Sequence, residues 1–164
     1  MNEEMIEFHY KAILQYTYLL VGNRQLAEDL TQDAFVKALK SCTIIESAQM
    51  QRAWLYKIAR NTVYDAMKRA KLIKFLPFGQ KEHLAQEFYE PEQWLTRDET
   101  NYELYKALGK LSFDYRQAIV LRKIEGLSIK ETADILGWNE SKVKNATERG
   151  MKKLQQLLGG NNGA

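Results

Sequence analysis

The chain has 164 residues, of which 45% are hydrophobic, so it has room for one ordinary folded domain or two small ones and is too apolar for a disordered chain. A single cysteine, Cys42, excludes an internal disulfide, and a reducing cytoplasmic setting is expected. The acidic start MNEEMIEFHYK is unlike a signal peptide, and no apolar run approaches the ~18 residues of a membrane span, so we expect a soluble protein without membrane insertion. The formal net charge of +3 is too small to identify a nucleic-acid-binding protein by itself.

Three helices are predicted in residues 1–71, at about 5–21, 24–40 and 52–71. The second begins after Gly22 and Asn23, and its apolar residues fall near one face; they are Leu26, Leu30, Ala34 and Leu39. The third has the same periodicity, carried by Trp54, Leu55, Ile58, Ala59, Thr62 and Ala66. These residues therefore predict a compact three-helix unit.

Residues 72–97 have no steady period and contain both prolines of the chain, Pro77 and Pro91. We interpret this stretch as a linker. It is more aromatic than a solvated tether needs, with Phe75, Phe78, Phe88, Tyr89 and Trp94. These side chains are expected to pack on a partner or on the flanking domains.

A second helical unit is predicted from about Asp98. One helix is lined by Leu104, Ala107, Leu108 and Leu111. Ser112 is expected to cap the next helix, which ends at Glu125 and Gly126. The last residues, 159–164, are expected to fray.

The stretch SIKETADILGWNESKV predicts two helices joined by a tight turn. Ser128 and Glu131 have the spacing of a capping box. The helix that they open should end at Gly137, which adopts a left-handed conformation at little cost, and Asn139 should cap the next helix, to about Leu158. A small Ala133 and an inward-facing Val143 would complete a helix-turn-helix, although any helical hairpin shares part of this pattern.

The second helix of this pair is basic. Residues 142–153 contain five cationic side chains and one acidic side chain, Glu148. The cationic residues are Lys142, Lys144, Arg149, Lys152 and Lys153. Such a cluster fits phosphate contacts, and it fits a solvated helix face about as well.

An enzyme is not expected. His9 and His83 lie in different parts of the chain, and no Gly-rich phosphate loop or cluster with metal-ligand spacing is present. We therefore expect no catalytic residues, no cofactor, no metal and no small-molecule substrate. A stand-alone helix-turn-helix regulator that binds duplex operators is the alternative DNA-binding class.

Three stretches, AEDLTQDAFVKAL, AWLYKIARNTVYDAMKR and LSIKETADILGWNESKVKNATERGMKKL, resemble the extracytoplasmic-function (ECF) sigma factors, in the family's order and spacing. The resemblance implies an all-α fold of two small helical domains. These would be region 2 at residues 1–71 and region 4 at residues 98–158, joined by the linker. It also implies core RNA polymerase, promoter DNA and an anti-sigma factor as partners.

Site residues carried over from the family fall in all three stretches. Asp29, Gln32 and Asp33 share one helix face and would bind core polymerase, although a solvated acidic helix start is the plainer explanation. The −10 single strand would meet the cationic and aromatic third helix and the loop at about Thr43 to Met50. The family positions for −10 contact are Trp54, Asn61 and Thr62, and the cationic residues Lys57 and Arg60 of the same helix are added to them; core packing is the alternative role of Trp54.

The −35 duplex would meet Lys142, Lys144, Asn145 and Arg149. The sequence departs from the family nearby. Ala146 replaces a usual Arg, Thr147 an apolar residue, and Glu148 an apolar or basic residue. Glu148 would either accept a hydrogen bond from a cytosine amine or weaken phosphate contact.

Overall fold

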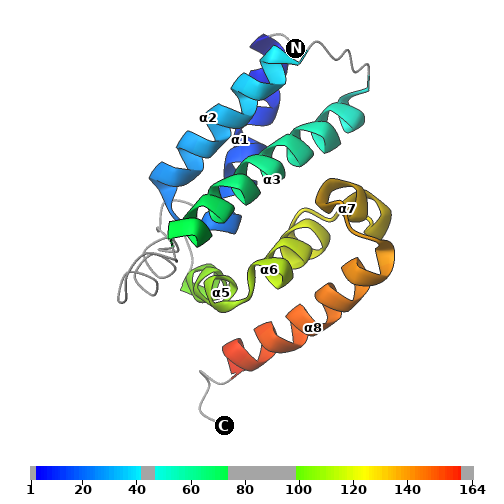
Figure 1. The fold of residues 1–164 in the computed structure, drawn as a ribbon. Helices are drawn as coiled ribbons and strands as arrows, with labels where there is room; N and C mark the ends of the chain where they lie inside the picture. The colour runs from blue at the N-terminus through cyan, green and yellow to red at the C-terminus, as the bar shows by residue number, and fades with distance from the viewer. Residues whose placement is uncertain (1–2, 42–46, 74–98, 160–164) are drawn as a thin grey trace. The chain divides into compact units, whose positions relative to one another are not determined.

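The computed structural model describes residues 3–41, 47–73 and 99–159. The fold is all-α, and no strand occurs in those three ranges (Figure 1). The chain forms two compact units, Met1–Glu90 and Pro91–Ala164. Within the described ranges, no helix combines the length and the apolar character needed to cross a bilayer.

The first unit is a three-helix arrangement of α1 (Glu3–Val21), α2 (Arg24–Lys40) and α3 (Ala48–Ile73), in which each helix contacts the other two (Figure 1). Its core contains the rings of Tyr16 and Tyr56, which meet edge to face with centroids 4.8 Å apart. Gly22 has a φ of 69° and ends α1, and Asn23 caps α2 by accepting a hydrogen bond of 2.9 Å from the Leu26 amide. The bounds predicted for α2 are confirmed.

The buried face of α2 differs from the predicted one at its end. Leu39 is 50% exposed, whereas Ala38 is fully buried. Ala34 and Ala38 are one i, i+4 step apart and share a face, but Leu39 lies about 140° around the helix from Ala34. The assignment of Leu39 to the buried face was therefore wrong.

Helix α3 is longer at both ends than predicted. The Ser47 hydroxyl accepts a hydrogen bond of 3.0 Å from the Met50 amide, so the helix begins at Ala48 and not at Arg52. The predicted loop at Thr43 to Met50 is thus too long by its last three residues. Residues 72 and 73, assigned to the linker, are also helical. The rest of that linker, with its prolines and aromatic residues, lies outside the described residues.

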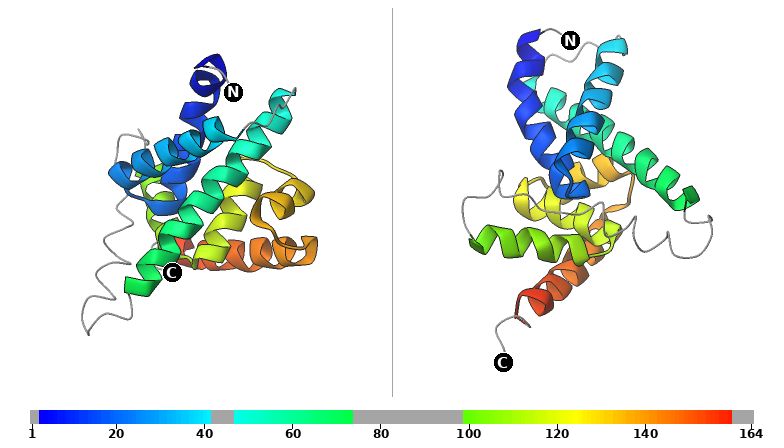
Figure 2. Two further views of the ribbon diagram at one scale, coloured as in Figure 1. Left: turned by 45° about the horizontal axis from the view of Figure 1, so that its top comes forward. Right: turned by 90° about the vertical axis from the view of Figure 1, so that its left-hand side faces the viewer.

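The second unit comprises α5 (Glu99–Lys110), α6 (Phe113–Ile119), a π-helical turn η2 (Val120–Ile124), α7 (Ile129–Leu136) and α8 (Glu140–Gly159). Helices α5, α6 and α7 all contact α8, and Figure 2 shows α6, in yellow-green, beside α8, in orange to red. Ser112 caps α6 as predicted, with its hydroxyl accepting from the Tyr115 amide at 3.3 Å.

A buried arginine joins the end of α5 to α6. Arg116 donates to the backbone oxygens of Leu108, Gly109 and Leu111 at 3.0, 3.2 and 3.1 Å. Carbonyls at a helix C-terminus lack intrahelical partners. The guanidinium therefore satisfies the end of α5 and fixes the angle at which α6 leaves it.

The tight turn between α7 and α8 has the predicted geometry. Ser128 and Glu131 form both hydrogen bonds of the capping box, at 3.0 and 3.3 Å. Gly137 has a left-handed φ of 69°, and the Asn139 side chain accepts a hydrogen bond of 2.7 Å from the Lys142 amide. Val143 is fully buried, so α8 is anchored on the core at its second turn.

Candidate nucleic-acid interface

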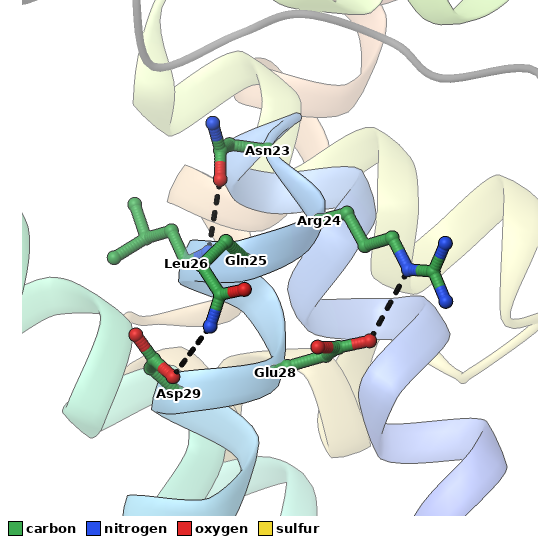
Figure 3. Close-up of polar contacts among 6 residues, drawn as sticks. All are labelled: Asn23, Arg24, Gln25, Leu26, Glu28 and Asp29. Atoms are coloured by element: carbon green, nitrogen blue, oxygen red, sulfur yellow. Dashed lines mark hydrogen bonds and ion pairs between the residues drawn. The ribbon is translucent and has the colours of Figure 1, made fainter.

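The first turns of α2 present the predicted acidic face. Asp29, Gln32 and Asp33 are all exposed. Figure 3 shows how the helix start is ordered: Gln25 donates to Asp29 at 3.1 Å, and Arg24 forms an ion pair with Glu28 at 3.2 Å. The carboxylate of Asp29 is thus oriented by a neutral donor, and its side chain is exposed to solvent.

The same surface of α2 continues into apolar residues that sequence reasoning did not assign. Val36 follows Asp33 by three positions and Leu39 follows Val36 by three, and they are 47% and 50% exposed. Residues three or four apart are neighbours on a helix surface. Exposed apolar side chains beside polar ones are a feature of protein-binding surfaces. The periodicity had placed Leu39 on the buried face of the helix, so its observed exposure is what identifies this apolar part of the α2 surface.

The predicted −10 surface lies on α3. Lys57 and Asn61 are exposed, and Trp54 and Arg60 are partly exposed. Arg60 donates to the Asn61 side chain at 3.3 Å. The partial burial of Trp54 leaves both of its predicted roles open.

A tyrosine extends this surface along α3. The Arg60 guanidinium lies 4.5 Å from the centre of the Tyr64 ring, and the Lys68 ammonium lies 4.8 Å from it. The two cations are thus held along one stripe of the helix by a shared aromatic ring. Tyr64 and Lys68 belong to the cationic and aromatic surface that the sequence predicts for this helix, although they are not among the five assigned −10 residues.

Thr62 is not part of this surface. It is only 4% exposed, and its hydroxyl donates to the Ile58 carbonyl at 2.8 Å and accepts from the Lys37 ammonium at 3.1 Å. A buried hydroxyl that already donates one hydrogen bond and accepts another cannot contact a DNA base. The assignment of Thr62 to DNA contact is corrected: the side chain joins α3 to α2.

The exposed face of α8 carries all four predicted −35 residues. Because Val143 points into the core, its neighbours point outward, and Lys142, Lys144, Asn145 and Arg149 are exposed. The three departures from the family pattern divide between the two faces of the helix.

Ala146 and Thr147 are buried, and the Thr147 hydroxyl donates to the Val143 carbonyl at 2.7 Å. Glu148 is exposed. Of these three departures, Glu148 is therefore the one that changes the solvent-facing surface.

An open recess of about 430 Å³ lies where the first turn of α6 meets α8. It is lined by Asp114, Tyr115, Asn139, Ser141, Lys142, Asn145, Ala146 and Arg149. The Lys142 ammonium lies 3.9 Å from the Asp114 carboxylate and 4.2 Å from the centre of the Trp138 ring. Sequence reasoning did not identify Asp114, because its contact with α8 joins residues far apart in the chain.

His9 is buried in α1. Burial lowers the pKa of its imidazole, a hydrogen bond with the Gln51 side chain raises it, and the positive charge of Arg52 lowers it. Within the described residues, no three His, Cys, Asp or Glu side chains lie together as metal ligands would.

The chain matches two family models in the same order as its two units. Residues 5–73 match Sigma-70 region 2, and residues 102–154 match Sigma-70, region 4. RNA polymerase sigma factor YlaC of Bacillus subtilis (strain 168) is 34% identical over 95% of this chain and 91% of its own length. ECF RNA polymerase sigma factor SigX of the same organism is 30% identical, over 94% and 81%.

Two solved structures are similar over most of the chain. One is the sigma factor RpoE in complex with the anti-sigma factor NepR from Bartonella quintana, with a TM-score of 0.73 and 28% identity over 95% of both chains. The other is CnrH in complex with the cytosolic domain of CnrY, with a TM-score of 0.66 and 26% identity over 96% of this chain and 86% of CnrH.

Proposed function

Because this chain belongs to the extracytoplasmic-function family of RNA polymerase sigma factors, we propose that it binds core RNA polymerase and directs it to a specific set of promoters. Residues 1–71 act as region 2, residues 98–158 as region 4, and residues 72–97 as the linker between them. The observation that carries the proposal is that both regions match in order, at residues 5–73 and 102–154, and that one sigma factor aligns with 95% of the chain. A stand-alone regulator would need only the second.

Core polymerase binds the exposed face of α2. Asp29, Gln32 and Asp33 supply the polar part of the surface, and Val36 and Leu39 supply its apolar part. Charges at such an interface steer association and fix its register. The aliphatic area that becomes buried on binding supplies affinity. This combination favours a protein partner over the alternative of a merely solvated helix start.

The −10 element binds as a single strand along α3. The phosphate backbone of the DNA strand contacts Lys57, Arg60 and Asn61. The exposed part of Trp54 offers a surface on which an unstacked base can lie. Extracting a base from the duplex costs a few kcal/mol, and contacts of this kind must return that energy. Thr62 acts indirectly, by holding α3 against α2.

The −35 element binds as a duplex against the exposed face of α8. Arg149 and Asn145 can form bidentate hydrogen bonds with guanine and adenine, respectively. Lys142 and Lys144 are point charges suited to phosphates. Glu148 either accepts from a cytosine amine or repels the backbone, and these two roles predict opposite effects of its removal.

An anti-sigma factor is the third partner. Two similar structures are sigma factors in complex with such inhibitors, NepR and the cytosolic domain of CnrY. By analogy, this chain is held inactive by a protein that covers its polymerase-binding surface. It works in the cytoplasm, where core polymerase is, and it carries out no chemical reaction of its own.

Reconstitution tests the function directly. Transcripts that rise on overexpression of the chain identify its promoters, and those promoters are then transcribed in vitro with purified core polymerase. Core polymerase with this protein should start at one defined position, and core polymerase alone should not. If the protein only blocks or recruits polymerase that already carries another sigma factor, the regulator interpretation is correct instead.

Alanine variants of α8 test the −35 surface. Arg149→Ala and Asn145→Ala should each cost about 1–3 kcal/mol on the target duplex and relax preference at particular base pairs. Lys144→Ala should weaken every duplex about equally and lower the salt slope by about one unit. Glu148→Ala should reduce specificity if the carboxylate reads cytosine, and raise affinity for all duplexes if it repels phosphate.

A further inference from the structure

Lys142 is restrained at both ends. Its backbone amide donates to the Asn139 side chain at 2.7 Å, which fixes the start of α8. Its ammonium lies between the Asp114 carboxylate, at 3.9 Å, and the Trp138 ring, at 4.2 Å from the centroid. A lysine on an exposed helix normally samples many rotamers. Here two partners from outside α8, Asp114 and Trp138, favour the rotamers that place the ammonium beside the recess between α6 and α8.

Asp114 also sets the charge of that recess. Lys142 and Arg149 line it with two positive charges, and Asp114 contributes one negative charge beside them. The Asp114 and Lys142 side chains are 57% and 50% exposed, so both are accessible to an approaching duplex. A phosphate that reaches this recess must come close to a carboxylate as well as to the two cations.

A restrained cation discriminates between registers. A free lysine follows whatever phosphate is nearest, so it stabilises target and non-target duplexes alike. A lysine held by Asp114 and Trp138 meets a phosphate only where the bound duplex brings one to it. The Asp114 carboxylate repels the backbone in every position, over the ~8–10 Å range of charge interactions at ordinary salt, and the contact between Lys142 and a phosphate offsets that repulsion only in the matching register.

We infer that Asp114 is a specificity-determining residue of the −35 surface: by restraining Lys142 and repelling misplaced phosphates, it weakens binding to non-target duplex more than binding to the target. The inference rests on the proposed function, since it assumes that α8 meets the −35 duplex. It assigns a role in recognition to a residue of α6, outside the helix that carries the base contacts.

Asp114 has a second effect that the test must separate. It lies in the first turn of α6, after the Ser112 cap, where a negative charge also stabilises the helix dipole. Loss of this effect would lower thermal stability. It would not tighten binding to DNA, so affinity and stability distinguish the two roles.

The test compares Asp114→Asn and Asp114→Glu in the full chain. The probes are a −35 duplex selected from a randomised pool by the unmodified protein with core polymerase, and a scrambled duplex of the same composition. Fluorescence anisotropy at several salt concentrations gives both affinities and the salt slopes. Glu103→Gln is the matched control, since it removes the same charge from an exposed site on α5.

Asp114→Asn should bind the scrambled duplex roughly 2- to 5-fold more tightly, as expected for the loss of an exposed ion pair and a repulsive charge. Its salt slope should steepen by up to about one unit, and the ratio of target to scrambled affinity should fall at least 2-fold. Asp114→Glu, which keeps the charge, should preserve that ratio, and Glu103→Gln should leave it unchanged.

Equal tightening on both duplexes would overturn the inference, because it would show a general charge effect without discrimination. Unchanged binding to both would overturn it as well. Failure of the proposed function has a different signature: Lys142→Ala and Arg149→Ala would then also leave binding to the selected duplex unchanged.

Discussion

Gly150 sets the distance between α6 and α8, and adding one methyl group there tests the packing. A Cβ on Gly150 would lie 2.9 Å from Ile119 Cδ1 and 3.2 Å from Tyr115 Cβ. Alanine gains about 1 kcal/mol over glycine in a helix interior. Overpacking costs about 1–3 kcal/mol. We therefore expect Gly150→Ala to lower the free energy of unfolding of this unit by about 1 kcal/mol.

A second substitution isolates the clash. Ile119→Val removes the Cδ1 atom that lies nearest, at an expected cost of about 0.5–1.5 kcal/mol by itself. In that background Gly150→Ala loses its 2.9 Å contact, and the contacts at 3.2 Å with Tyr115 Cβ and 3.3 Å with the γ carbon of residue 119 need only small shifts. The double variant should be more stable than the sum of the single effects by at least about 0.5 kcal/mol.

Because the chain has two compact units, one unfolding curve for the whole chain would mix their free energies. Hydrogen exchange of the amides in α6 and α8 measures the free energy of the second unit alone. If Gly150→Ala stabilises α8 by the full ~1 kcal/mol of its helix propensity, and its effect adds to that of Ile119→Val, then α6 and α8 are not in the close contact described. Target-duplex affinity should fall with Gly150→Ala, because a shift of α8 moves the recess.

Replacing Asp29 and Asp33 together by lysine should weaken binding to core polymerase in a direct titration while the helical circular dichroism stays the same. Replacing the exposed Glu4 and Glu7 of α1 together by lysine is the charge-matched control. Unchanged affinity of the first double variant would return Asp29 and Asp33 to a solvated role. Thr62→Val should cost about 0.5–1.5 kcal/mol of unfolding free energy through its lost hydrogen bonds, with −10 preference unchanged in abortive-initiation assays; a changed preference at full stability would restore the base contact. Burial lowers the pKa of His9 below the ordinary value of 6.5, so the unfolded state takes up the proton first as pH falls below that value. Stability should therefore decline below pH 6.5, and urea titrations of His9→Gln should show less of this decline; an equal decline would assign it to other groups.

Four helix starts were predictable because the hydrogen bonds that cap them are local. A capping side chain must satisfy backbone amides within three residues, so it indicates a helix start in the sequence itself. The four caps are Asn23, Ser112, Ser128 and Asn139. The left-handed turn at Gly137 follows from the same local chemistry. The family-level assignment rested on similar ground, since its three motifs are short and lie in order.

Thr62 was misassigned and Asp114 was missed because contacts across the fold decide their roles, whereas the misassignment of Leu39 came from its angle around its own helix. Thr62 looked available from its place in the motif, but Lys37 of α2 occupies its hydroxyl. Leu39 is apolar, yet its angle around α2 leaves it exposed. No periodicity within α8 could reveal that Asp114 of α6 holds Lys142. The start of α3 is a local exception, since Ser47 offered a cap signal that was not used.

Three residues of α8 depart from the family pattern, but only one of them, Glu148, has a side chain exposed to an approaching duplex. Ala146 and Thr147 are buried, so their effect on recognition acts through the packing of α8, whereas Glu148 is exposed. Two exposed carboxylates lie on or beside the proposed −35 surface, Glu148 on α8 and Asp114 on α6. Each adds a negative charge to a surface whose other charges attract phosphate. A sigma factor gains nothing from tight binding to arbitrary duplex, because non-target sites vastly outnumber promoters. Carboxylates that reduce general affinity while the base contacts are kept are a physically reasonable way to favour the correct −35 element.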